Sequence, residues 1–159
     1  MKTSQYWIEH LNLERHAEGG YYRQVLKSKE QYENRALYTS IYFLLEHGNP
    51  SHFHQLTADE VWYYHAGYTL TIHMITESGT YKTIKLGSNL EAGEVLQAVV
   101  PKDTIFGSSV ENTDEYALVS CMVAPGFEYE DFKLFTQDEL IARFPEHASV
   151  IRKYALKKV

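Results

Sequence analysis

The chain has 159 residues, the length of one ordinary domain, and its 44% hydrophobic and 23% charged residues indicate a folded globular protein and exclude a disordered one. The formal net charge of −6 disfavours a nucleic-acid partner, and no apolar run approaches the ~20 residues that a membrane span requires. Cys121 is the only cysteine, which excludes an intrachain disulfide and favours a reducing cytoplasm.

Apolar residues at helical spacing predict a short amphipathic helix over residues 4–13. After it, short runs of β-forming residues recur at intervals of about ten residues, with turn residues between them. The runs cover residues 18–26, 37–45, 61–64, 69–75, 81–86, 95–100 and 117–123. Strands at this spacing without intervening helices favour an antiparallel sandwich or barrel and disfavour a parallel α/β sheet.

The last part of the chain returns to a helical pattern. Thr136 and Glu139 have the spacing of a capping box, and Pro145 suits the first turn of a second short helix. We therefore expect a single domain over residues 1–159, with a β-barrel at about 18–135 and C-terminal helices at about 136–155.

Histidines and an acidic residue gather in the middle of the chain. His52 and His54 are two residues apart, so in a strand they project from the same face. Glu60 begins the next expected strand, and if it points inward, alternation places Trp62 and Tyr64 beside it. An imidazole, a carboxylate and an aromatic wall would then converge.

This arrangement suits two kinds of chemistry. His52, His54 and Glu60 offer imidazole and carboxylate donors to a divalent metal such as Zn, Ni, Mn or Fe. The same groups can also act without a metal, with a carboxylate orienting a histidine that carries a proton.

Four motifs, taken in order, resemble the cupin superfamily, and more closely a small single-domain branch catalogued as a domain of unknown function. The motifs are HAEGGYYR at residues 16–23, SIYFLL at 40–45, DEVW with HAG at 59–67, and VAPGF at 123–127. The resemblance covers about residues 5–145. It implies an all-β fold, a double-stranded β-helix or cupin jelly-roll barrel, with short N- and C-terminal helices and usually a homodimer.

The departures from the cupin pattern decide the prediction about metal. Metal-binding cupins place a glutamate four or five positions after a pair of histidines, and a further histidine in their second motif. Here Glu60 lies six positions after His54, and Phe106 occupies the later histidine position. We therefore predict no resident metal or other cofactor. A site formed by His52, His54 and Glu60 remains the alternative, and it requires a bulge to adjust the register.

The resemblance also extends to metal-free cupins of the sugar-nucleotide epimerase type, which use a histidine base, a tyrosine acid and an arginine for anionic groups. By that analogy His54 is the expected catalytic base and Glu60 the carboxylate that orients it. Gln97 belongs to an apolar run, where a polar group needs a partner or a ligand. The residues expected to bind the ligand are Arg23, Tyr42, His52, Trp62, Tyr64, Gln97 and Phe106.

The function predicted is that of a small-molecule-binding cupin, with isomerase or epimerase activity on a sugar or related polar metabolite. Two alternatives stay open: a non-catalytic metabolite-binding module, and a metal-dependent enzyme such as a dioxygenase. The sequence leaves the substrate unnamed. It also leaves open whether Glu18 and His73 line the pocket, and it predicts that His73 is exposed if Leu70, Ile72 and Met74 face the core.

Overall fold

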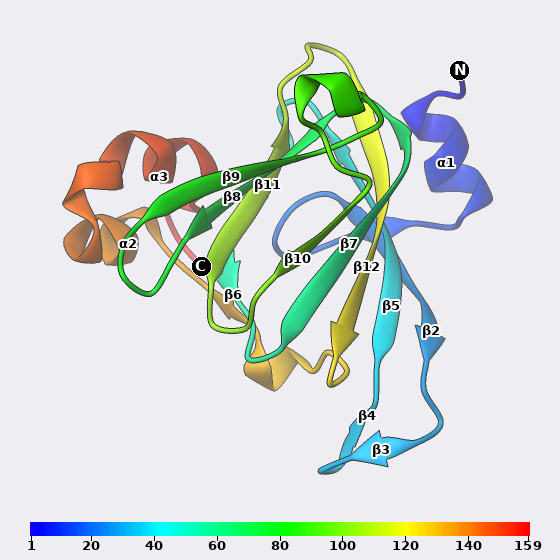
Figure 1. The fold of residues 1–159 in the computed structure, drawn as a ribbon, viewed down its shortest axis with the longest axis horizontal. Coiled ribbons are helices and arrows are strands. Elements are labelled where there is room, and N and C mark those ends of the chain that lie inside the picture. The colour runs from blue at the N-terminus through cyan, green and yellow to red at the C-terminus, as the bar shows by residue number, and fades with distance from the viewer.

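The computed structural model describes residues 1–159, and two antiparallel sheets form its body (Figure 1). The first sheet has the order β1-β2-β5-β12-β7-β10, and the second has the order β13-β6-β11-β8-β9. The strands of the first sheet are β1 (Glu14–Arg15), β2 (Tyr21–Lys27), β5 (Thr39–Glu46), β12 (Tyr116–Ala124), β7 (Asp59–Gly67) and β10 (Gln97–Val100). Those of the second sheet are β13 (Lys133–Leu134), β6 (Ser51–Gln55), β11 (Ile105–Val110), β8 (Leu70–Ile75) and β9 (Tyr81–Leu86).

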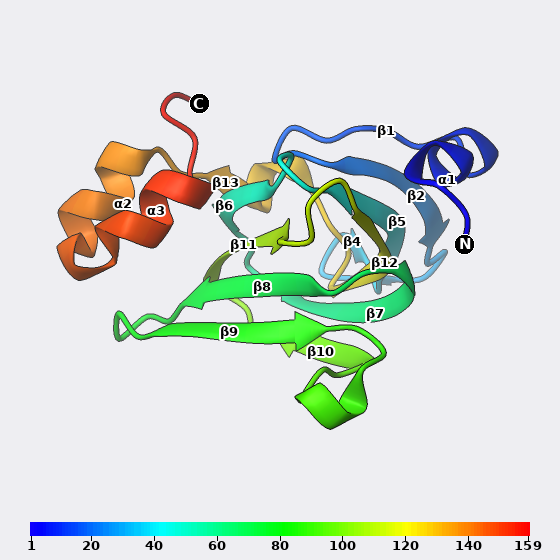
Figure 2. The ribbon, with the colours of Figure 1, turned by 90° about the horizontal axis from the view of Figure 1, so that it is seen from above.

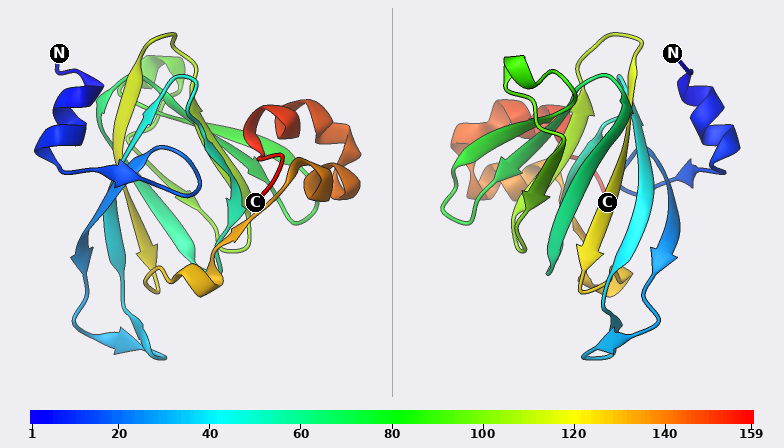
Figure 3. Two further views of the ribbon diagram at one scale, coloured as in Figure 1. Left: turned by 180° about the vertical axis from the view of Figure 1, so that it is seen from behind. Right: turned by 45° about the vertical axis from the view of Figure 1, so that its right-hand side comes forward.

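Helices lie at the two ends of the sandwich (Figure 2). Helix α1 (Ser4–His10) packs beside β5 and β12, whereas α2 (Gln137–Arg143) and α3 (Ala148–Tyr154) pack at the far end of the second sheet. Short 3₁₀ turns are η1 (Leu90–Ala92), η2 (Tyr129–Asp131) and η3 (Pro145–His147). A small hairpin of β3 (Gln31–Tyr32) and β4 (Arg35–Ala36) projects from the body between β2 and β5 (Figure 3). None of the helices has the length and apolar character needed to cross a membrane.

Two large apolar clusters hold the sheets and the C-terminal helices together, and a smaller one packs beneath α1. The larger cluster fills the space between the sheets and includes Phe43, Trp62 and Phe106. The second cluster lies on the other face of the second sheet, where Phe53 and Leu140 pack between the strands and α2 with α3. Strand β8 is consequently buried along its whole length.

The prediction of an all-β jelly roll with terminal helices is confirmed. Thr136 and Glu139 form the capping box that opens α2. Among the strands longer than two residues, β11 is absent from the predicted runs because Gly107, Ser108 and Ser109 interrupt its β-forming pattern. Strand β6, which is short and follows a proline, was expected only from the spacing of His52 and His54. Strand β10 is an exposed edge strand, so the prediction that Gln97 lies in a buried strand is wrong.

Candidate functional site

A cavity of about 220 Å³ opens between the two sheets. Strands β2, β5, β7 and β12 line it from the first sheet and β6 from the second, together with residues 16–18 and the segment of residues 125–132, here called the mouth segment. The lining residues are His16, Glu18, Tyr22, Gln24, Thr39, Ile41, His54, Leu56, Glu60, Cys121, Val123, Phe127, Tyr129 and Phe132. The lining combines buried polar groups with aromatic rings, a composition that suits a small organic ligand.

A β-bulge in β6 decides which of its side chains face the cavity. Where β6 pairs with β11, His52 and Phe53 together lie opposite Gly107 alone. A β-carbon at residue 107 would lie 2.7 Å from the carbonyl oxygen of Ser51, so the close approach requires glycine. The extra residue reverses the alternation, and Ser51 shares the inward face with His54 in place of His52.

The loop of residues 16–20 inserts an acidic side chain beside this strand. Gly19 has φ +110°, and a β-carbon there would lie 2.0 Å from the carbonyl oxygen of Pro50, so the loop is packed directly on the start of β6. The backbone N–H and the Nδ1–H of His52 both donate to the carbonyl oxygen of Glu18, at 2.6 and 2.8 Å. These contacts hold the Glu18 side chain inside the sandwich.

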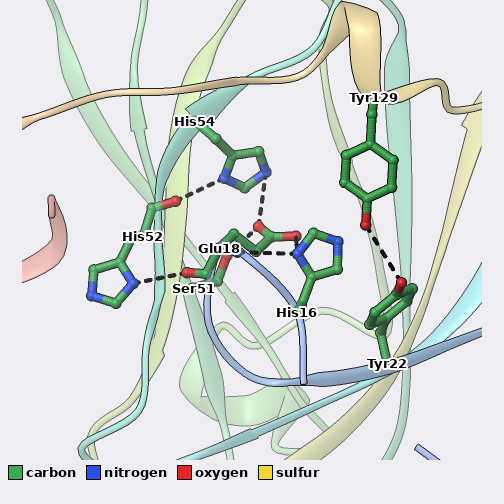
Figure 4. Close-up of polar contacts among 7 residues, drawn as sticks. All are labelled: His16, Glu18, Tyr22, Ser51, His52, His54 and Tyr129. Atoms are coloured by element: carbon green, nitrogen blue, oxygen red, sulfur yellow. Dashed lines mark hydrogen bonds and ion pairs between the residues drawn. The ribbon is translucent and has the colours of Figure 1, made fainter. Parts of the chain in front are cut away.

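Glu18 and His54 form a buried ion pair (Figure 4). Nε2 of His54 lies 3.0 Å from Oε2 of Glu18, and the hydroxyl of Ser51 donates to the same oxygen at 2.5 Å. Nδ1–H of His54 donates to the carbonyl oxygen of His52 at 2.8 Å, so both ring nitrogens carry a proton.

The protonation states of this pair follow from its contacts. Burial alone would raise the pKa of Glu18, but the charge and hydrogen bond of His54 outweigh burial and lower it to about 2. Burial alone would lower the pKa of His54, but the charge of Glu18 outweighs it and raises the pKa. The pair is therefore a carboxylate and an imidazolium at neutral pH.

Glu60 is the second carboxyl of the cavity, and its protonation state is opposite to that of Glu18. Its side chain points inward from β7 and is only 8% exposed. Burial and the negative charge of Glu18 raise the pKa of Glu60 to about 8, against smaller opposing effects of His54, Cys121 and Trp62. The carboxyl is therefore mostly protonated at pH 7. Burial and the two acidic groups also raise the pKa of the Cys121 thiol well above its usual range, so it is not a thiolate nucleophile.

His16 connects the polar groups to the aromatic mouth. Its Nδ1 accepts a hydrogen bond from the backbone N–H of Glu18 at 3.1 Å and also lies 3.3 Å from Oε1 of Glu18. With Nδ1 as the acceptor, the proton of the neutral ring is on Nε2. Burial lowers the pKa of His16 despite the nearby Glu18 charge, so the neutral form is favoured. Figure 4 shows Nε2 pointing away from Glu18, toward Tyr22 and Tyr129, whose hydroxyls lie 3.4 Å apart.

Two of the predicted site residues, His54 and Glu60, line the cavity together. Their relation differs from the prediction, because His54 forms its ion pair with Glu18 and not with Glu60. The predicted inward alternation of Glu60, Trp62 and Tyr64 along β7 is confirmed, since all three face the interior of the sandwich.

Three predicted ligand contacts belong to the core beneath the cavity. Trp62 and Phe106 are each 1% exposed, and their ring centroids lie 6.4 Å apart. Tyr64 packs against the same apolar cluster between the sheets. Phe106 lies against His54, with ring centroids 4.2 Å apart, so it supports the site from behind. None of the three lines the cavity, which corrects their predicted role as its walls.

The other predicted contacts lie outside the cavity. Arg23 and Tyr42 are paired across β2 and β5, and Arg23 is exposed because its neighbours on β2 take the inward positions. His52 is turned aside by the bulge, and Gln97 is exposed on the edge strand. His73 is 5% exposed because α3 covers it, so its predicted exposure is wrong; it also lies outside this cavity.

The sequence left open whether Glu18 lines the pocket and did not predict His16, nor the aromatic mouth. His16 and Glu18 both belong to the HAEGGYYR motif, and the paired glycines were the available signal: they mark a backbone that must approach another segment closely. Tyr129 and Phe132 follow the last recognised motif and carry no comparable signal.

The donor set does not fit the metal that many cupins hold. His52 faces away from His54, Phe106 has no donor atom, and both nitrogens of His54 carry protons. No group of three or more histidine, cysteine, aspartate or glutamate side chains has a metal-binding arrangement. The three-ligand alternative of His52, His54 and Glu60 is therefore not formed: the bulge exists, but it moves His52 away.

Comparison with known proteins places the fold and the family. A protein from Leishmania major is 41% identical, with a TM-score of 0.94, and the match covers 98% of this chain and 99% of that chain. Protein SO0799 from Shewanella oneidensis is 49% identical, also with a TM-score of 0.94, over 98% of both chains. A variant of Bacillus subtilis oxalate decarboxylase, 18% identical, shares the fold with a TM-score of 0.58 over 88% of this chain and 36% of that longer chain. The family model described as "Cupin superfamily (DUF985)" matches residues 5–135, and the chain therefore belongs to this cupin family.

Proposed function

We propose that the chain is a small-molecule enzyme that moves protons without a metal, of the isomerase or epimerase type, acting on a compact polar metabolite. The observation that carries the proposal is the pair of carboxyls in one cavity with opposite protonation: Glu18 ionised by His54, and Glu60 with a pKa of about 8. Two titratable groups separated in this way are a common arrangement for acid–base catalysis.

Glu60 is the proton-exchanging group in this proposal. A catalytic acid or base works best when its pKa lies near the working pH, which the value of about 8 satisfies. The ionised carboxylate takes a proton from a carbon next to a carbonyl, the electron pair of the broken C–H bond forms an enolate, and Glu60 returns the proton to the same carbon or to the former carbonyl carbon. In the second case the proton of the neighbouring hydroxyl passes to the former carbonyl oxygen, so that the carbonyl group moves by one carbon.

The other polar groups support that transfer. Nε2–H of His16 points into the cavity and is placed to donate a hydrogen bond to the enolate oxygen. The His54–Glu18 ion pair contributes a fixed imidazolium beside the reacting groups. His54 itself is a positioning residue here, since neither nitrogen is free to accept a proton.

Deuterium exchange tests the proposal before any substrate has been identified. The full chain is incubated in D₂O with a panel of aldoses, ketoses and amino sugars, and loss of carbon-bound protons is followed by ¹H NMR. Exchange on at least one compound is expected, with a rate that rises through about pH 8, and Glu60→Gln should lower it by a factor of about 10² to 10⁴. The exposed control Glu91→Gln should leave it unchanged.

One observation favours a second candidate, the non-catalytic metabolite-binding module. The nitrogens of His54 are both engaged in hydrogen bonds, so the histidine expected to act as base is not available. Absence of exchange for every compound in the panel, together with measurable binding, supports this second candidate over the enzyme.

The proposal also retains two expectations from the sequence, a homodimer and a cytoplasmic location. Sedimentation equilibrium of the purified chain tests the first, because a dimer would double the 18.4 kDa mass of one chain. Fractionation of the native host cells tests the second.

A further inference from the structure

The cavity contains one more acidic group than it has positive charge to balance. Glu18 is paired with the imidazolium of His54, 3.0 Å away. Glu60 makes no ion pair, although its side chain is more than nine-tenths buried and lines the cavity. The neutral Cys121 thiol and Trp62 indole lie beside it, and Nε1 of Trp62 has no hydrogen-bond partner. His16 is the remaining imidazole and is neutral, and no lysine or arginine lines the cavity.

Aromatic rings of the mouth segment line the same cavity as these acidic groups, and the ring centroid of Phe132 lies 5.3 Å from that of His54. Phe127, Tyr129 and Phe132 pack edge to face in the mouth segment, with ring centroids 4.9 to 6.0 Å apart. Tyr22 lies across from them on β2 and meets Tyr129 through its hydroxyl. Edge-to-face packing turns ring faces in several directions, and the negative face of an aromatic ring attracts a cation.

We propose that this cavity binds a compact organic cation, a substituted ammonium group on a small body, whose positive charge is paired with the Glu60 carboxylate and enclosed by the aromatic mouth. The inference rests on the proposed function, which assigns the cavity as the ligand site, and it adds the charge class of the substrate. A cavity of about 220 Å³ lies below the roughly 300–1,000 Å³ of sites for drug-sized ligands, which limits the cation to a small metabolite.

Binding of such a cation also changes the state of Glu60. The protonated carboxyl releases its proton to solvent, and the charge of the ligand takes its place beside the carboxylate. The groups that act electrostatically on Glu60 are Glu18 from the loop before β2, His54 from β6 and Cys121 from β12, and only His54 among them is cationic. An ionised Glu60 is the form that can accept a proton from the substrate.

Matched probes of different charge test the inference. Isothermal titration of the full chain at pH 7.5 compares choline with 3,3-dimethylbutan-1-ol, its neutral isostere, and with the anion 3,3-dimethylbutanoate; tetramethylammonium and ethanolamine extend the cations. We expect at least one cation to bind about tenfold or more tightly than the neutral alcohol, with release of protons to the buffer, and the anion to bind most weakly.

Two variants locate the effect. Glu60→Gln should remove the advantage of the cation, bringing its affinity to within about twofold of that of the neutral alcohol, because the amide keeps the shape but carries no charge. Glu91→Gln, at an exposed position, should leave all affinities unchanged.

Three results would overturn the inference: equal or tighter binding of the neutral alcohol, preference for the anion, or no binding of any of the three cations at millimolar concentration. If Glu60→Gln does not fold, the order of the affinities of the cation, the neutral alcohol and the anion for the unmodified chain still decides whether the cavity prefers a cation. If only the proposed enzyme activity is wrong, no deuterium exchange is observed, but the cation still binds more tightly than the neutral alcohol. If only this inference is wrong, a neutral substrate still undergoes deuterium exchange, but the cation has no advantage in binding.

Discussion

Replacing Glu60 by glutamine should change how the stability of the fold depends on pH. The pKa of this buried carboxyl is about 8 in the folded chain and 4.5 for an ordinary glutamate. Between these values the folded chain holds a proton that the unfolded chain has released, so the free energy of unfolding falls as the pH rises, by at most about 1.4 kcal/mol per pH unit. From pH 5.5 to pH 8 the loss due to Glu60 sums to about 3 kcal/mol.

Glutamine has no proton to lose, so the variant lacks this dependence. The free energy of unfolding of Glu60→Gln minus that of the unmodified chain should increase by about 3 kcal/mol between pH 5.5 and pH 8. Urea unfolding of both proteins at pH 5.5, 6.5, 7.2 and 8 gives the difference, and subtracting the two curves removes the contributions of groups that do not interact with Glu60. Glu91→Gln serves as the exposed control. A difference that stays constant within about 0.5 kcal/mol would refute the reasoning that Glu60 is buried without a charged partner.

The remaining predictions concern the elements that build the site. His54→Ala leaves the Glu18 carboxylate buried without its partner and should destabilise the fold by about 3–5 kcal/mol in urea unfolding; a loss below about 1 kcal/mol would argue against the buried pair. Gly107→Ala places a β-carbon 2.7 Å from the carbonyl oxygen of Ser51 and should cost about 1–3 kcal/mol, whereas an unchanged unfolding midpoint would rule out the close approach at the bulge. Arg35 donates to backbone carbonyl groups of the mouth segment, so Arg35→Ala should accelerate amide hydrogen exchange there; unaltered exchange would show that the segment is held by other contacts. After dialysis against Zn²⁺ or Mn²⁺ and a wash, elemental analysis should find far less than one ion per chain, and stoichiometric metal would contradict the reading of the donor set.

Strand alternation and motif order were sufficient to predict the fold and two residues of the site, His54 and Glu60. The inward face of β7, with Glu60 and Trp62, followed from a regular period of two. The four motifs pointed to the family, and the capping box at Thr136 located the start of α2. These features depend on neighbouring residues, which is why a single sequence contains them.

The features that the sequence did not predict depend on contacts between distant segments. The bulge that separates His52 from His54 exists because β6 lies beside Gly107, more than fifty positions later in the chain. Glu18 reaches the cavity because its loop packs on Pro50, and Arg23 faces outward because its neighbours on β2 line the cavity. Alternation identifies which residues share a face, but not which face is buried.

The carboxyl titrations of Glu18 and Glu60 test the central claim most directly. Carbon-detected NMR of the chain labelled with ¹³C at the glutamate side chain follows each carboxyl separately, with Glu18→Gln and Glu60→Gln supplying the assignments. We expect Glu60 to titrate with a midpoint near pH 8 and Glu18 to stay ionised down to the lowest pH at which the chain remains folded. Two carboxyls that both titrate near their ordinary pKa of 4.5 would contradict this expectation.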